Sequence, residues 1–422
     1  MKHKANKTIT IKEYWFLSSC EDAQYESGVS AYIDPTTFDE IKKFLLDEKN
    51  QAYEVLTLAR RRWYGEIIKA QNYVWVIQTS NGTSIEILPK ISDSIDIDNT
   101  RSIFLKMLKS LKNSPFKNIE KASLKRQKFP ILEIFISLFL HELDLLVKKG
   151  IKRNYVVQER NVWFLKGKFK AGNNIKHNLT HKERFYCEFD EFTDNIKENK
   201  LIKTCLQHLA KVSRKEENKQ KIKEFLFIFA EIDASKNIKY DSASLNNLNR
   251  LSNYYADTLQ RVKIFLLGES VVNFAWSTLA LSLLFPMEKI FENYVAKKLK
   301  HCYPHRDIRT QDTTHYLVEY HNERRKFNMR PDIVIANKAI IADTKWKVID
   351  QEDAQSNYNV SQADMYQLFA YAKKYNAKSV YLIYPKTDKF TKPLNPFHYE
   401  KDDTILHVIP YDLVTDHCEE FI

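Results

Sequence analysis

The pattern of apolar positions divides the chain into three segments, the first of which is rich in predicted strands. Residues 1–95 contain short runs of alternating or continuous apolar residues, as half-buried and buried strands do. The clearest pair, residues 73–78 and 84–88, flanks Asn81-Gly82, which is a typical two-residue hairpin turn. The segment therefore predicts a small β-rich N-terminal domain.

Helical spacing replaces this pattern in residues 96–275. Apolar residues recur at three- and four-residue intervals, which predicts helices at 130–148, 216–232 and 243–267. Short strand-like pieces lie between them, in residues 155–192. We expect a mainly helical middle domain.

A basic region opens this middle segment. Residues 101–128 carry nine basic side chains and a single acid, Glu120, beside a helical apolar stripe. A basic face next to a buried stripe is able to follow a DNA backbone. An ordinary solvated face explains the same composition, so the two interpretations stand side by side.

Strands and helices alternate in residues 276–422, which predicts an α/β domain. The order is one helix, two strands around Asn337-Lys338, a second helix and a third strand. The predicted elements are helix 286–300, strands 331–336 and 339–346, helix 361–375 and strand 379–384. The whole chain is thus expected to be an α+β multidomain protein.

Two carboxylates and a lysine stand out in the paired strands. Asp343 and Lys345 share one face of their strand because side chains alternate sides, and strand pairing brings Asp332 close to them. An unpaired carboxylate inside an apolar strand is costly, so these acids indicate a site. Mg²⁺ prefers such oxygen ligands, and the backbone carbonyl of Thr344 is a further candidate. Lys345 would orient the attacking water or neutralise charge on a phosphate.

The flanking helices add candidates. Glu292 on helix 286–300 is either a third metal-binding carboxylate or an ordinary solvated charge. Gln367 and Tyr371 fall on one face of helix 361–375, where they either support the site and touch DNA or make ordinary polar contacts.

Basic residues also precede the first acid. Arg324, Arg325 and Arg330 lie just before Asp332 and are expected to hold the phosphate backbone of a substrate near the metal.

The order of these elements resembles the PD-(D/E)xK nuclease superfamily, and the Gln-x-x-x-Tyr pair resembles its RecB-type branch. Over most of its length the chain resembles the McrC family, the nuclease subunits of the McrBC 5-methylcytosine-dependent restriction system. The segments that carry this resemblance are 73–78, 85–91, 165–169, 187–192, 198–202, 291–295, 331–332, 343–345 and 362–371.

The resemblance implies a Mg²⁺-dependent endonuclease that cuts methylated double-stranded DNA. It also implies a separate AAA+ GTPase partner of the McrB type, which the N-terminal domain would dock and stimulate. The sequence agrees, because none of its seven glycines forms a P-loop of the Gly-x₄-Gly-Lys-Ser/Thr type. Two alternatives remain: a stand-alone RecB-like repair nuclease, and a non-catalytic DNA-binding or motor-activating adaptor.

Composition narrows the class of protein further. The net charge of +12 and the pI near 9.1 suit a polyanionic partner. No apolar run reaches the roughly 18–20 residues of a membrane span, and the first residues do not predict a secretory signal. Five scattered cysteines, none in Cys-x-x-Cys spacing, argue against a zinc site or a disulfide framework. We expect a cytoplasmic protein.

Overall fold

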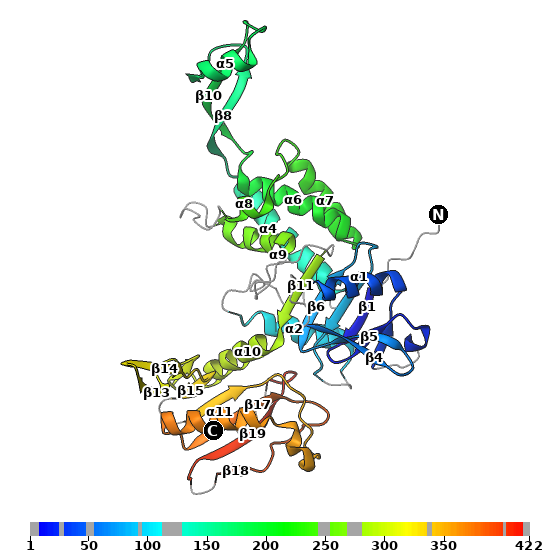
Figure 1. Ribbon diagram of the computed structural model, residues 1–422, viewed down its shortest axis with the longest axis vertical. Helices are drawn as coiled ribbons and strands as arrows, with labels where there is room; N and C mark the ends of the chain where they lie inside the picture. The colour runs from blue at the N-terminus through cyan, green and yellow to red at the C-terminus, as the bar shows by residue number, and fades with distance from the viewer. Residues whose placement is uncertain are drawn as a thin grey trace. The chain divides into compact units, whose positions relative to one another are not determined.

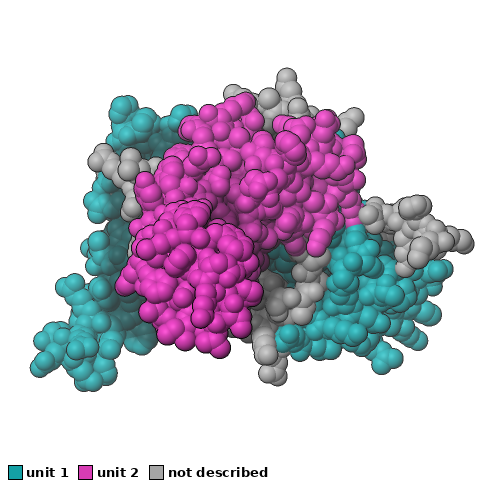
Figure 2. All heavy atoms as spheres, turned by 90° about the horizontal axis from the view of Figure 1, so that it is seen from above, with its two compact units in different colours: residues 1–131, 270–422 teal, residues 132–269 magenta. Residues whose placement is uncertain are grey.

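The structure is a computed structural model that describes residues 8–24, 29–47, 55–91, 95–111, 129–243, 254–267, 281–335, 340–399 and 402–416. The chain forms two compact units, which Figure 2 colours separately. Unit 1 combines residues 1–131 with 270–422, and unit 2 comprises residues 132–269. These units do not coincide with the three predicted segments 1–95, 96–275 and 276–422, although the predicted mixture of helices and strands is confirmed.

The N-terminal strands of unit 1 build two sheets (Figure 1). The predicted hairpin is confirmed, because β6 pairs with β7 antiparallel and places Trp75 opposite Ile87. The first sheet has the order β1 (Thr8–Lys12), β7 (Ser84–Leu88), β6 (Tyr73–Gln78) and β11 (Leu281–Pro286). The second has the order β3 (Ser30–Tyr32), β2 (Phe16–Ser18), β5 (Gly65–Ala70) and β4 (Leu56–Arg61).

Helix α1 (Pro35–Leu46) packs into the core of these sheets. Asp34 caps its N-terminus, because the Asp34 side chain accepts a hydrogen bond from the Thr37 backbone N–H at 3.0 Å. Phe38, Ile41 and Phe44 then follow at helical spacing and are buried in the core that also contains strand residues of both sheets. The remaining helical elements of this region are the 3₁₀ turn η1 (Glu21–Gln24) and α2 (Ile97–Leu108).

Strand β11 lies more than 200 residues beyond its neighbour in the first sheet. It falls in residues 276–422, the segment expected to form the nuclease domain alone, yet it pairs antiparallel with β6. Trp75 on β6 also donates a hydrogen bond to Ser282 at 2.6 Å. The chain therefore returns to the N-terminal sheet before it enters the next domain.

Unit 2 is mainly helical, as predicted. The structure ends the helix expected at 216–232 at Ile228, and the helix expected at 243–267 is described only from Ala256 onward, since residues 244–253 lie outside the described part. Its helices are α4 (Ile131–Lys149), α5 (Ala171–His177), α6 (Lys197–Val212), α7 (Glu216–Ile228), α8 (Ile238–Ala243) and α9 (Ala256–Leu267). Its strands, β8 (Asn154–Val162), β9 (Lys168–Phe169) and β10 (Phe185–Thr193), form one sheet in the order β8-β10-β9.

A six-stranded mixed sheet forms the C-terminal part of unit 1. Its order is β12 (Ile308–Thr310), β15 (Ile333–Ile335), β16 (Ile340–Thr344), β17 (Ser379–Pro385), β19 (Ile405–Tyr411) and β18 (Phe397–His398). Helices α10 (Met287–Cys302) and α11 (Gln362–Tyr375) contact it and match the predicted helices closely, while β13 (Tyr316–His321) and β14 (Arg324–Asn328) form a separate hairpin. A 3₁₀ segment, η7 (Ala354–Asn359), precedes α11.

Two predicted features lie wholly or partly outside the described residues. The turn Asn337-Lys338 lies outside the described residues, but the strands on either side of it pair antiparallel as predicted. Residues 112–128 of the basic segment also lie outside them. Within the described ranges, no helix has the length and apolarity needed to cross a bilayer.

Candidate active site

Asp332 and Asp343 meet at the end of the two adjacent strands β15 and β16. The register ends with Ile333 opposite Ala342; Asp332 directly precedes β15, and Asp343 is the next residue of β16. The two carboxyls lie close enough for the negative charge of Asp343 to raise the pKa of Asp332. The structure thus brings together the two carboxylates that the sequence predicted to lie close.

The Asp332 carboxylate is held in a fixed orientation. Its Oδ2 accepts hydrogen bonds from the backbone N–H and the hydroxyl of Thr344, each at 2.8 Å. Its Oδ1 accepts another from the Gln311 amide at 3.0 Å. Three donors on one carboxylate leave it little rotational freedom, which is what a metal-binding group requires.

The Lys345 ammonium lies beside the second acid. Its Nζ is 2.7 Å from Asp343 Oδ2, and the Asp343 side chain is buried. The same ammonium donates to Gln367 Oε1 at 3.4 Å, and the Gln367 amide donates to the Tyr371 hydroxyl at 2.7 Å. Gln367 and Tyr371 therefore reach the predicted site through Lys345, as a chain of hydrogen bonds from α11.

Asp364, a residue outside the predicted site, joins this arrangement from the first turn of α11. Its carboxylate is buried and lies 3.6 Å from Lys345 Nζ and 3.0 Å from Lys347 Nζ. The sequence held a signal for it, because Asp364 shares a helix face with Gln367 and Tyr371.

Glu292 reaches the same place from α10, and the link is Gln311. The Gln311 amide nitrogen donates to both Glu292 and Asp332, and the Gln311 backbone N–H donates to the Asp332 carbonyl at 3.0 Å. Glu292 is partly buried, which argues against the simple solvated charge that was its alternative. Nothing local in the sequence marks Gln311, since its importance arises from strand pairing.

Burial raises the pKa values of all three acids, and negative charges of nearby carboxylates add to the increase. For Asp332, burial and then the negative charges of Asp343 and Glu292 raise the pKa to about 7. Burial also raises the pKa of Asp343, opposed by the Lys345 ammonium. For Glu292, burial raises the pKa, its hydrogen bond from Gln311 lowers it, and Asp343 raises it further.

For the lysine, burial and the neighbouring negative charges shift the pKa in opposite directions. Burial by itself lowers the pKa of Lys345, but the adjacent Asp343 carboxylate outweighs burial and leaves that pKa raised. The ammonium is therefore charged at neutral pH, and one cation faces several acids.

These residues fit a hard divalent cation. Three neighbouring acids with raised pKa values are a concentration of negative charge, which one lysine only partly offsets and a bound cation would offset further. Among the described residues, no group of three or more His, Cys, Asp or Glu side chains converges tightly enough to hold an ion alone. A site built from Asp332, Asp343, the Thr344 carbonyl and waters matches Mg²⁺, which usually keeps several waters.

The three predicted phosphate-binding arginines occupy different positions. Arg324 and Arg325 are exposed on the hairpin strand β14, and Arg325 lies 3.5 Å from Glu319. Arg330 is exposed two residues before Asp332, and its positive charge acts on Glu292 by lowering the pKa of that carboxyl. Arg330 thus belongs to the immediate site, while the other two lie on an arm that leads away from it.

Comparison with known proteins places the chain in a family. A family model described as McrBC 5-methylcytosine restriction system component matches residues 68–385. The chain belongs to this family. The match spans both units and includes every acid and the lysine of the candidate site, and it confirms the predicted relationship to McrC.

A solved structure shows the same fold. A chain from the tetradecameric assembly of Thermococcus gammatolerans McrB AAA+ hexamers with bound McrC aligns with a TM-score of 0.67 and 17% identity, covering 96% of this chain and 95% of that one. A chain of the Thermococcus gammatolerans McrBC complex aligns over 69% of this chain and 87% of its own, with 19% identity and a TM-score of 0.46. No curated protein matches the sequence.

Proposed function

We propose that this member of the McrBC family is a Mg²⁺-dependent DNA endonuclease, the nuclease subunit of a 5-methylcytosine-dependent restriction system. The observation that carries the proposal is the cluster of Asp332, Asp343 and Lys345 on one end of the C-terminal sheet. Membership of the family supplies the biological setting, and the cluster supplies the means of hydrolysis.

The chain's own residues would divide the work as follows. Asp332 and Asp343 hold the ion, with Thr344 and Gln311 fixing the first of these carboxylates. A bound Mg²⁺ polarises a phosphate oxygen and lowers the pKa of a bound water. Lys345 places a positive charge beside that position, where it stabilises the charge that develops on the phosphate.

The substrate is positioned by contacts to its phosphates. Arg330 is exposed two residues before Asp332. Arg324 and Arg325, exposed on β14, add two positive charges on the hairpin that precedes it. Phosphate contacts of this kind fix the position of a duplex without reading its sequence. Selection of the methylated base is therefore assigned to a partner.

We further propose that this partner is a separate AAA+ GTPase, because the chain has no P-loop and its structural neighbour comes from an assembly with McrB AAA+ hexamers.

The N-terminal domain was expected to dock this partner, but exposed apolar side chains gather on the β8-β10-β9 module of unit 2, which Figure 1 shows at one end of that unit. Large exposed apolar patches mark interaction surfaces. The exposed apolar side chains of this module are those of Tyr155, Val157, Trp163, Phe164, Leu165, Phe169, Ile175, Leu179 and Phe192.

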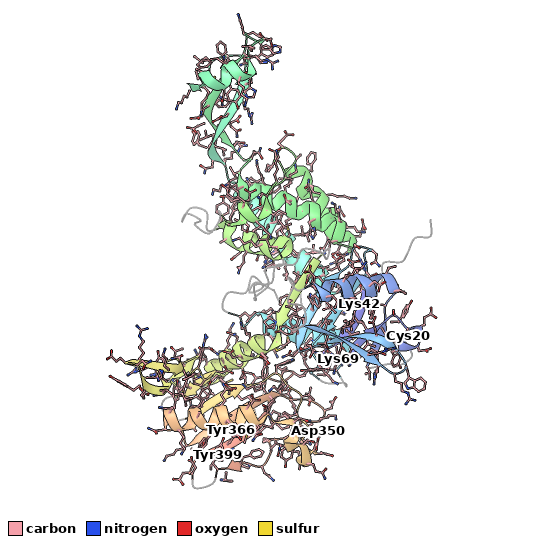
Figure 3. The ribbon with its side chains drawn as sticks, in the orientation of Figure 1. Cys20, Lys42, Lys69, Asp350, Tyr366 and Tyr399 are labelled. Atoms are coloured by element: carbon pink, nitrogen blue, oxygen red, sulfur yellow. The ribbon has the colours of Figure 1, made fainter. Side chains whose placement is uncertain are left out.

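Cleavage of a methylated plasmid by the complete complex, with GTP and Mg²⁺, tests the proposal. Asp343→Asn should abolish cutting while GTP hydrolysis by the complex persists. Asp350→Asn is the matched control, because this acid, labelled in Figure 3, makes its ion pair with Lys389 at 2.9 Å and should leave cutting intact. Cutting by the Asp343→Asn complex would overturn the site, and vigorous cutting by the isolated chain would favour the stand-alone nuclease.

A further inference from the structure

The hairpin β13–β14 connects strand β12 to Asp332 and strand β15, at the edge of the candidate site. Strands β12 and β15 pair antiparallel up to Thr310 and Ile333, and the Gln311 backbone N–H then donates to the Asp332 carbonyl at 3.0 Å. The chain between Gln311 and Asp332 forms the hairpin, so the arm starts at the first metal-binding acid. Figure 1 shows it as a separate two-stranded projection beside β15.

Solvent surrounds most of this arm. Every residue of β14 is exposed, and four of the six residues of β13 are exposed. Strand β13 contacts α11, and its Tyr316 and Val318 are half-buried, but a two-stranded hairpin covered so little is marginally stable in water. An arm of this kind gains stability when a partner covers it, so its surface composition indicates what that partner is.

Large apolar side chains on the arm point to a partner that accepts aromatic rings. Tyr320 is 80% exposed and Phe327 is 72% exposed. Phe327 also has a φ of +56°, a left-handed conformation that is unfavourable for a bulky side chain. Strain of this sort persists at functional positions more often than elsewhere, and here it lies five residues before Asp332.

The charges of the arm select a polyanion. Arg324, Arg325 and Lys326 lie on the same hairpin as the two aromatic residues; its acids are Glu319 and Glu323, and Glu319 lies 3.5 Å from Arg325. Basic side chains near exposed rings form the usual surface for nucleic acid, in which the cations bind phosphates and the rings contact bases.

We propose that β13–β14 is a DNA-gripping arm whose Tyr320 and Phe327 side chains insert against the bases or sugars next to the scissile phosphate. This inference rests on the proposed nuclease function and deepens it, because it assigns to the arm a contact that distorts the duplex where it is to be cut. Rings inserted between base steps partly unstack them, and such local unstacking opens the backbone to the metal-bound water.

Binding of the full-length chain to a short duplex, measured by fluorescence anisotropy in EDTA, separates the two kinds of contact. Tyr320→Ala and Phe327→Ala should each raise Kd about fivefold, which is the smallest effect expected from the loss of one base–aromatic stacking contact. Neither variant should change how Kd depends on salt. Arg324→Ala should instead lower the slope of log Kd against log salt by about one. Phe227→Ala, an 84% exposed ring in unit 2, is the control and should bind as wild type does.

A second measurement tests unstacking directly. A duplex with 2-aminopurine near its centre should become brighter when wild type binds, and this increase should be lost with the Tyr320→Ala, Phe327→Ala double variant at saturating protein. Unchanged Kd and unchanged fluorescence in the double variant would overturn the proposal. It would also fall if the double variant lost assembly with the GTPase partner in size-exclusion chromatography while binding DNA normally.

The same data distinguish failure of the arm from failure of the nuclease. Normal cleavage together with normal DNA binding by the double variant would refute the proposed role of the arm and leave the proposed nuclease function standing. Weakened DNA binding by the double variant, with no Mg²⁺-dependent cleavage by the wild-type complex, would refute the proposed nuclease function and leave the arm as a DNA-binding element.

Discussion

Glu13 offers a test of the structure that does not depend on catalysis. The residue follows β1, and its side chain is completely buried. Its Oε2 accepts hydrogen bonds from the Lys90 backbone N–H and from the Trp346 indole N–H, both at 2.9 Å. Burial raises the pKa of Glu13 to about 8, and these two hydrogen bonds only partly oppose it. Ionisation of the Glu13 carboxyl therefore destabilises the folded state.

The sign of the pH dependence follows from this raised pKa. Below pH 4.5 the carboxyl is protonated in both states, so it does not affect stability. Between 4.5 and about 8 the unfolded chain releases the proton and the folded chain keeps it, so stability falls as pH rises. At about 1.36 kcal/mol for each pKa unit, the loss reaches at most about 5 kcal/mol and is complete above pH 8.

Glu13→Gln removes this titration while it keeps a carbonyl oxygen for the same two donors. Urea unfolding followed by tryptophan fluorescence at pH 5.5, 7 and 9 should show that wild type loses stability with rising pH and that the variant loses several kcal/mol less. Tyr14, beside Glu13, does not obscure the result, because burial and the Glu13 charge raise the pKa of its phenol and keep it neutral here.

A matched control is Glu66→Gln on β5. Glu66 is half exposed and forms a surface ion pair with Lys42 at 2.5 Å, which is expected to contribute at most about 1 kcal/mol. Its pH profile should follow that of wild type. Parallel profiles for wild type and Glu13→Gln would refute the reasoning, because they would show that Glu13 is not buried as a titrating acid in solution.

Three further predictions concern the candidate site and its support. At a hundredfold excess over its Kd, Mg²⁺ should raise the free energy of unfolding of wild type by about 2.7 kcal/mol and so raise the melting temperature, and differential scanning fluorimetry should show that this rise disappears in Asp332→Asn. Asp364→Asn should slow cleavage about tenfold without changing the KM for DNA, because Asp364 helps to hold Lys345 and not the substrate; a raised KM with unchanged kcat would contradict this. Trp346→Phe should cost about 1–3 kcal/mol in urea unfolding, since it leaves the buried Glu13 without its indole donor, and that cost should shrink when Glu13→Gln is also present.

Local pattern determined the elements and the central pair of the site. The paired strands β15 and β16 lie next to each other in the sequence, so alternation and antiparallel pairing were enough to predict Asp332 near Asp343 and Lys345. Helices α10 and α11 were equally predictable, because their apolar stripes repeat at helical spacing. Such signals act over a few residues, and the sequence records them directly.

Tertiary structure alone decided which distant segments surround that pair. Gln311 reached Asp332 through the pairing of β12 with β15, β11 joined a sheet formed by residues more than 200 positions earlier, and Glu13 met Trp346 across 333 positions. The order of the chain carries no local mark of these contacts. They arise because sheets and helices must bury their apolar faces together, and the polar groups enclosed in that process must find partners among whatever side chains the packing brings within reach.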